Sequence, residues 1–166
     1  MKKSILILIL SLSLIMGFSL AALTAPVTLQ WNFGAGEPPT LDPALGSDTT
    51  SILVIEQLFL GLTDFNDETM EIVPELATSW EVSEDGLVWA FHMRKDVYWT
   101  DGTPVTAHDI EYGVKRTCDP ATASSYAYVL YIIRGAKEVN TGEITDLDHI
   151  GAVSYTHLTL PTTPYV

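Results

Sequence analysis

The side chains that could do chemistry are few and lie far apart in these 166 residues. His92, His108 and His149 fall at no spacing that is typical of a metal site. Neither the nucleophile motif Gly-x-Ser-x-Gly nor the zinc motif His-Glu-x-x-His occurs. The acidic run at 64–68 lacks the glycine and the closing glutamate of a calcium loop. We therefore expect no enzyme, no metal site and no cofactor.

The charge balance argues against nucleic acid as a partner. The chain carries 21 acidic and 8 basic residues, a formal net charge of -13, and its basic residues form no cluster of the kind that phosphate binding needs. The single cysteine, Cys118, excludes a disulfide framework. Composition leaves two classes open, a module that binds a small solute in a cleft and a secreted structural, adhesive or glycan-binding domain. A secreted hydrolase is a further alternative.

The first residues have the pattern of an export signal. Lys2 and Lys3 precede an almost purely apolar stretch, Ile5–Leu20, and Ser19–Ala21 has small residues at both key cleavage positions. This pattern predicts a cleaved signal peptide over residues 1–21, and an uncleaved membrane anchor is the alternative. No cysteine follows the apolar stretch, so we expect no lipid-modified end. The protein is expected to be periplasmic or extracellular.

The last residues, 153–166, do not continue the pattern that precedes them. Val153–Thr162 has no charged residue and resembles the translation of a transposon-end adapter used in sequencing libraries. We interpret residues 153–166 as an artefact of sequence assembly, with a genuine short apolar tail as the alternative. Residues 22–152 then remain as the part of the chain that folds.

Hydrophobic periodicity within this part predicts alternating strands and helices, an α/β fold. A strand is expected at 27–33, and a hairpin at 78–94 turns at Ser83–Gly86. The helices have capping residues. A helix is expected over 50–60, between Asp48 and Gly61. A second helix is expected to begin at Thr106, with Asp109 as its capping partner, and to run to about Thr117. A helical segment that ends near Gly135, a loop at 140–143 and an approach to a strand at 144–152 are expected to follow.

Most large apolar side chains fit a core. The stripe on the first helix, the aromatic side chains of the hairpin and the turn after it, and the thiol of Cys118 are interpreted as buried. Three tyrosines near residue 130 either stack on a ligand or pack with their hydroxyls at the surface. These residues are Ile52, Ile55, Phe59 and Leu62 on the helix, Trp80, Trp89, Phe91 and Trp99 in the hairpin and turn, and Tyr126, Tyr128 and Tyr131.

Four motifs in order make the stretch Glu37–Gly135 resemble the N-terminal part of the family 5 extracellular solute-binding proteins. Glu37–Pro43 resembles the opening loop of the family and Leu58–Leu62 the exit of its first helix. Pro74–Gly86 and Trp89–Ala107 are similar to the family signature. The resemblance covers essentially all of the chain between the expected signal and residue 152.

This resemblance implies a two-lobed periplasmic-binding-protein fold of type II, of which residues 22–152 would be the N-terminal portion and an incomplete part of one lobe. It implies capture of a small solute by hinge closure and delivery to an ABC permease in the membrane, driven by an ATPase. An oligopeptide is the expected ligand, and sugars and nickel complexes are alternatives within the family. We expect a monomer.

The resemblance places the ligand-binding residues in the opening loop, at Gly36, Glu37 and Pro38. They would offer backbone hydrogen bonds, and Glu37 would meet a cationic group such as a peptide amine. A plain surface turn is the alternative. Because members of the family are several times longer, we expect this chain alone to bind ligand weakly and to expose apolar surface where the rest would pack.

Overall fold

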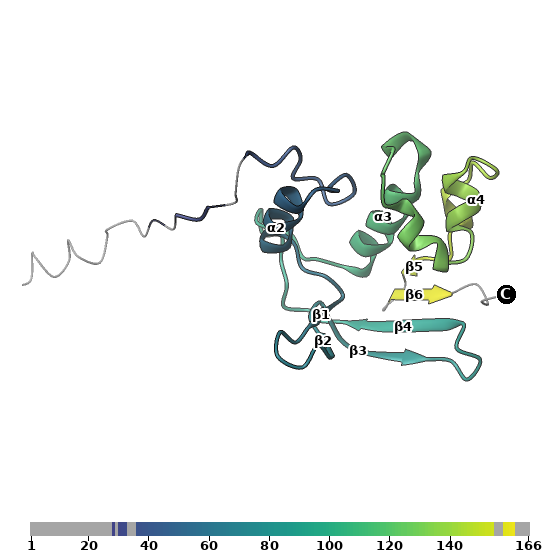
Figure 1. Ribbon diagram of the computed structural model, residues 1–166. Coiled ribbons are helices and arrows are strands. Elements are labelled where there is room, and N and C mark those ends of the chain that lie inside the picture. Colours follow the sequence, from purple (N-terminus) through teal and green to yellow (C-terminus); the bar gives the residue numbers. More distant parts are fainter. Residues whose placement is uncertain (1–27, 29, 33–35, 155–157, 162–166) are drawn as a thin grey trace, which may run out of the picture. The chain divides into compact units, whose positions relative to one another are not determined.

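A computed structural model of the chain describes residues 28, 30–32, 36–154 and 158–161 (Figure 1). The chain divides into two units, 1–32 and 33–166, and every element below lies in the second unit. The expected signal peptide, 1–21, lies outside the described residues. The expected strand at 27–33 lies partly outside them, and its described positions 28 and 30–32 form no strand. No helix among the described residues is long and apolar enough to cross a membrane.

Helix α2, Thr49–Leu58, begins as the sequence predicts and ends earlier. The Asp48 carboxylate accepts a hydrogen bond from the Ser51 amide at 2.9 Å, which confirms the cap. Gly61 as the helix terminator is wrong, because Phe59 already has an extended backbone, with φ -127° and ψ 146°. The interpretation of the apolar stripe as core is wrong for Phe59, whereas Ile52, Ile55 and Leu62 are half-buried. Within α2 the buried side chain is that of Ser51, and Phe59 after it is exposed.

The expected hairpin is confirmed as strands β3, Ala77–Val82, and β4, Val88–Met93. The Gly86 amide donates to the Ser83 carbonyl at 2.8 Å, and Gly86 has the positive φ of 72° that closes the turn. Trp80 lies opposite Phe91, and their ring centroids are 6.4 Å apart, so aromatic rings cover one face of the pair. A second, two-stranded sheet pairs β1, Thr63–Phe65, with β2, Ile72–Pro74.

Two short strands complete the larger sheet, whose order is β3-β4-β6-β5. Strand β5, Val153–Ser154, and strand β6, Leu158–Pro161, are antiparallel to each other, and β6 is also antiparallel to β4. Both strands come from the segment interpreted above as adapter-derived. Because backbone pairing is open to most sequences, the interpretation of this segment stays a prediction.

Helix α3, Ala107–Cys118, has the predicted start. The Asp109 carboxylate accepts hydrogen bonds from the Thr106 amide at 2.7 Å and from the Thr106 hydroxyl at 2.8 Å. The helix contacts β5, β6 and α4, Ala136–Asn140 (Figure 1). This packing places α3 between the sheet and the last helical turns of the chain.

The core lies where the end of α3 meets α4 and the segment that follows it. Cys118 is fully buried there, as predicted, and burial raises the pKa of its thiol to about 11, so the thiol stays neutral. Trp99 as a core residue is wrong, because the residue is 41% exposed. The cluster consists of Cys118, Ile133, Ala136, Val139, Ile150 and Ala152.

The tyrosine segment is a short 3-10 helix, Ala127–Ile132, rather than a longer helix that ends at Gly135. Gly135 instead begins α4, with a φ of 77°. The hydroxyl of Tyr131 donates to Asn140 Oδ1 at 2.7 Å, so this tyrosine is tied to the end of α4. Tyr126 and Tyr128 are exposed. The loop expected at 140–143 begins one residue later, because Asn140 still belongs to α4. The residues after the loop form the 3-10 turn Leu147–His149 before β5.

Gly135→Ala is expected to destabilise the chain. A Cβ at this position would lie 2.5 Å from the His149 carbonyl oxygen. The positive φ alone costs an alanine about 1–2 kcal/mol, so the loss in the free energy of unfolding, measured by chemical denaturation, should reach at least that size. Gly113→Ala is the control. Gly113 lies within α3 with open space around it, so alanine should raise stability by up to about 1 kcal/mol. A neutral Gly135→Ala would contradict the packing described.

Candidate functional site

The opening loop is organised around Asp42. The amide of Ala44 donates to Asp42 Oδ1 at 3.0 Å, and the amide of Gly46 donates to the Asp42 carbonyl at 2.9 Å. On the other side, the Asp42 amide donates to the Thr40 hydroxyl at 3.1 Å. The Thr40 amide in turn donates to the buried hydroxyl of Ser51 in α2 at 3.3 Å. These bonds fix a turn that leads directly into α2.

Arg116 of α3 joins this loop to the rest of the unit. Its Nη1 donates to Asp42 Oδ1 at 2.7 Å, and its Nη2 donates to Asp42 Oδ2. The side chains of both residues are about one-third exposed or less. The hydrogen bond from Arg116 lowers the pKa of Asp42 despite the opposing effect of burial. A bidentate pair of this kind holds both position and orientation.

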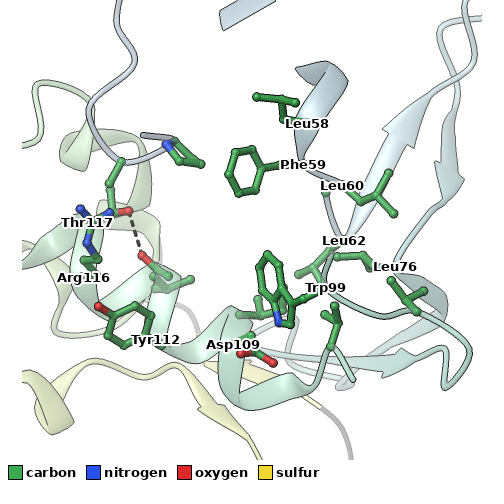
Figure 2. A pocket seen from close by; sticks show the side chains of 18 of the residues that line it. Leu58, Phe59, Leu60, Leu62, Leu76, Trp99, Asp109, Tyr112, Arg116 and Thr117 are labelled. Atoms are coloured by element: carbon green, nitrogen blue, oxygen red, sulfur yellow. Dashed lines mark hydrogen bonds between the residues drawn. The ribbon is translucent and has the colours of Figure 1, made fainter. Parts of the chain in front are cut away.

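A cleft of about 700 Å³ lies between the end of α2, the turn before α3 and the exposed side of α3 (Figure 2). Pro43 and Ala44 of the opening loop also line it, so the loop forms part of its wall. The volume is in the range of small-molecule sites, which are typically about 300–1,000 Å³. Most of the lining side chains are apolar, among them Leu58, Phe59, Leu60, Leu62, Leu76 and Trp99.

Three polar side chains that line the cleft have hydrogen-bond partners within the chain. Asp109 caps α3, Arg116 is paired with Asp42, and the Thr117 hydroxyl donates to the Gly113 carbonyl at 2.8 Å. Tyr112 is exposed at the edge of the cleft. The cleft therefore suits apolar groups better than ions.

The residues predicted to bind ligand lie elsewhere. Gly36 and Glu37 are exposed and Pro38 is half-buried, directly before the turn that begins at Thr40. The cleft lining does not include any of the three. These three residues make up the whole predicted site, and their role in ligand binding stays a prediction. Sequence reasoning missed Arg116 as the partner of this loop.

A second polar cluster surrounds Glu111 in α3. Lys115 Nζ lies 2.6 Å from Glu111 Oε1 and 2.7 Å from Asp148 Oδ1. Burial opposes the ionisation of Glu111, but the hydrogen bonds from Lys115 and Ser154 outweigh it and lower the pKa of Glu111 to about 2. The cluster thus ties α3 to the residues that follow α4 and to β5.

Ser154, His108 and Glu111 have the residue types of a hydrolase triad but not its geometry. The Ser154 hydroxyl contacts both His108 Nδ1 and Glu111 Oε2. In a triad the acid holds the ring nitrogen that faces away from the serine, whereas here both groups lie on the Nδ1 side. Among the described residues, no group of three histidine, cysteine, aspartate or glutamate side chains could hold a metal ion.

Comparison with known proteins gives a consistent result. Residues 71–149 match the family model of the bacterial extracellular solute-binding proteins, family 5 Middle. The chain is 45% identical over 107 residues to the oligopeptide-binding protein OppA of Bacillus subtilis, covering 64% of this chain and 19% of that protein. It is 40% identical over 120 residues to the periplasmic murein peptide-binding protein MppA of Escherichia coli, covering 71% of this chain and 22% of MppA. The chain thus spans about a fifth of the length of these relatives.

Solved structures of such proteins contain the same fold. The unliganded open form of the murein tripeptide-binding protein MppA matches with a TM-score of 0.70 and 39% identity, over 76% of this chain and 25% of MppA. The Haemophilus influenzae OppA complex with RPPGFSPFR matches with a TM-score of 0.73 and 32% identity, over 81% of this chain and 26% of OppA. The expected fold class is confirmed, because the chain is part of a larger, lobed α/β fold of type II.

Asp42→Asn should destabilise the chain in a pH-dependent way. The variant loses a charge-assisted bond and leaves Arg116 without its anion, so the free energy of unfolding should fall by about 1.5–3 kcal/mol at neutral pH. The Asp42 pKa is lowered on folding. Its contribution is therefore present above the ordinary aspartate pKa and is lost as the pH falls through the lower folded pKa. Denaturant titrations at several pH values should show the difference vanish in acid.

Asp96→Asn is the matched control for this ion pair. Asp96 also forms a bidentate pair, with Arg94, at 2.7 and 2.8 Å, but its side chain is 72% exposed. Exposed pairs contribute little to stability, so this variant should unfold almost as the parent does. Equal effects of the two substitutions would show that the Asp42–Arg116 pair does not hold the loop.

Proposed function

We propose that this chain, which belongs to the family 5 bacterial extracellular solute-binding proteins through its residues 71–149, is part of a protein that captures oligopeptides outside the cytoplasmic membrane and delivers them to an ABC permease. The observation that carries the proposal is the joint match to the family and to peptide-binding proteins of the same fold. The relatives are binding proteins by name, not enzymes.

The names of the relatives support a peptide as the ligand. They include oligopeptide-, dipeptide- and murein peptide-binding proteins, and one solved relative is a complex with the nonapeptide RPPGFSPFR. A further relative, 37% identical over 91 residues, is a probable deoxycholate-binding periplasmic protein of Escherichia coli. Oligopeptides are therefore the ligand class that we propose, and an amphipathic acid is the competing class to include in a binding screen.

The opening loop is where we propose that this chain meets the peptide. Gly36 and Pro38 would contribute backbone groups, and the Glu37 carboxylate would accept hydrogen bonds from the amino terminus of the peptide. Glu37 is exposed. The residues that follow it are held by the Thr40–Asp42 turn and by Arg116, so the loop begins from a fixed point. A fixed turn directly after the loop limits how far the loop must be ordered when a peptide binds.

Capture of a peptide also needs a second wall. The chain covers about a quarter of each solved relative, and enclosure of most of a ligand surface is typical of tight small-molecule sites. We propose that the complete protein binds peptide by closing over it and that residues 22–152 alone bind it weakly. Sub-micromolar binding by this chain in calorimetry would overturn this part of the proposal.

Glu37→Gln in the complete protein should weaken binding of peptides that have a free amino terminus. Loss of the charge-assisted bond should raise the Kd by about tenfold or more, since hydrogen bonds to charged groups contribute about 1.5–3 kcal/mol. Isothermal titration with a peptide and with its N-acetylated form measures the effect. The acetylated peptide should bind the parent and the variant alike. Glu84→Gln, in the exposed hairpin turn, is the control and should change neither Kd. An unchanged Kd for the free peptide would remove Glu37 from the site.

Delivery to a transporter predicts a particular set of neighbouring genes. The gene for a solute-capture protein of this class is expected to lie beside genes for two permeases and for one or two ATPases. Sequencing of the flanking DNA checks this expectation and also shows which codons follow residue 152. Neighbours without a transporter would favour a secreted structural domain instead.

A further inference from the structure

Met70 is an apolar side chain that belongs neither to the lining of the cleft nor to the buried cluster around Cys118. It is 69% exposed and lies in the turn 66–71, which joins β1 to β2. Its backbone has a φ of 59°, in the left-handed region that a long side chain rarely adopts. The function proposed above makes no use of this side chain.

The turn that carries Met70 is held by backbone groups and by the side chain of Asn66. The Met70 amide donates to the Asn66 carbonyl at 2.8 Å, and the Asn66 amide donates to the Glu71 carbonyl at 2.9 Å. Asn66 Oδ1 accepts hydrogen bonds from the amides of Glu68 and Thr69, each at 2.9 Å. The thioether of Met70 takes no part in these bonds, so a chemical change at its sulfur leaves the turn intact.

Met93 carries the same thioether in different surroundings. It lies in β4 and is half-buried, and the residue opposite it in β3 is Ala77, which is fully buried. A methionine sulfoxide is polar, and a polar group needs a hydrogen-bond partner where water is excluded. Oxidation of Met93 would therefore lower stability, whereas oxidation of Met70 would place the new oxygen in water.

We infer that Met70 is a site of reversible oxidation by hydrogen peroxide and that the fold tolerates this modification. The sulfur attacks one peroxide oxygen, and the S–O bond forms as the O–O bond breaks. Two electrons pass from sulfur to the peroxide, whose second oxygen takes both hydrogens and leaves as water. Asp67, Glu68 and Glu71 lie in the same turn, so an uncharged oxidant approaches the sulfur more readily than an anionic one.

Mild peroxide treatment of the complete protein, followed by proteolysis and mass spectrometry, tests the site. Met70 should gain one oxygen about tenfold faster than Met93, because oxidation follows exposure of the sulfur to solvent. In concentrated urea the two rates should become equal. Equal rates in the folded protein, or a difference that persists in urea, would overturn the inference.

Chemical denaturation of the treated protein tests whether the fold tolerates the modification. At a dose that oxidises Met70 and spares Met93, the midpoint of unfolding should not change. Met70→Leu is the matched variant, because leucine keeps an apolar side chain that peroxide does not oxidise. A loss of stability in the treated parent that Met70→Leu prevents would contradict the inference.

Treatment with a methionine sulfoxide reductase tests reversibility. The enzyme should remove the added oxygen from Met70 in the folded protein, because the side chain is exposed. A sulfoxide that is reduced only after unfolding would count against the inference. None of these measurements uses a peptide, so their outcome does not depend on the proposed function.

Discussion

The pair between Asp42 and Arg116 is the constraint on which the arrangement of the unit depends. It joins a loop before α2 to the second half of α3, across 74 residues of sequence. Asp42 also holds the turn that leads into α2, and Pro43 next to it lines the cleft. A single carboxylate thus sets where α2 begins relative to α3. Because the pair is partly shielded from water, loss of either partner would leave a charge without its counter-ion.

Two apolar regions with different surroundings follow from this arrangement. One is the buried cluster between α3, α4 and the last turn, where Cys118 is fully enclosed. The other is the cleft surface beside α2, where Phe59 and Leu60 are exposed. A small folded unit buries only a limited share of its apolar surface, so an exposed apolar region beside a buried one is expected.

Local features of the fold could be predicted from the sequence, because their determinants are close neighbours in the chain. The Asp48 cap, the Thr106–Asp109 capping pair and the hairpin that turns at Gly86 all depend on residues within a few positions of each other. Apolar pattern also indicated which side chains favour burial. It could not indicate which of these side chains the folded unit leaves exposed, so the predictions of Phe59 and Trp99 as core residues are wrong. The Asp42–Arg116 pair has no spacing signal, because its partners meet only in the folded unit. The ligand-binding residues Gly36, Glu37 and Pro38 stay a prediction that rests on family resemblance.

The central proposal is that the Asp42–Arg116 pair holds the turn that follows residues 36–38 and that the peptide binds against these three residues. Crystal structures of the complete protein with and without an oligopeptide test it most directly. The account predicts that the ion pair is intact in both structures and that the amino terminus of the peptide lies against Glu37. An ion pair that breaks on closure, or a peptide bound away from residues 36–38, would contradict it.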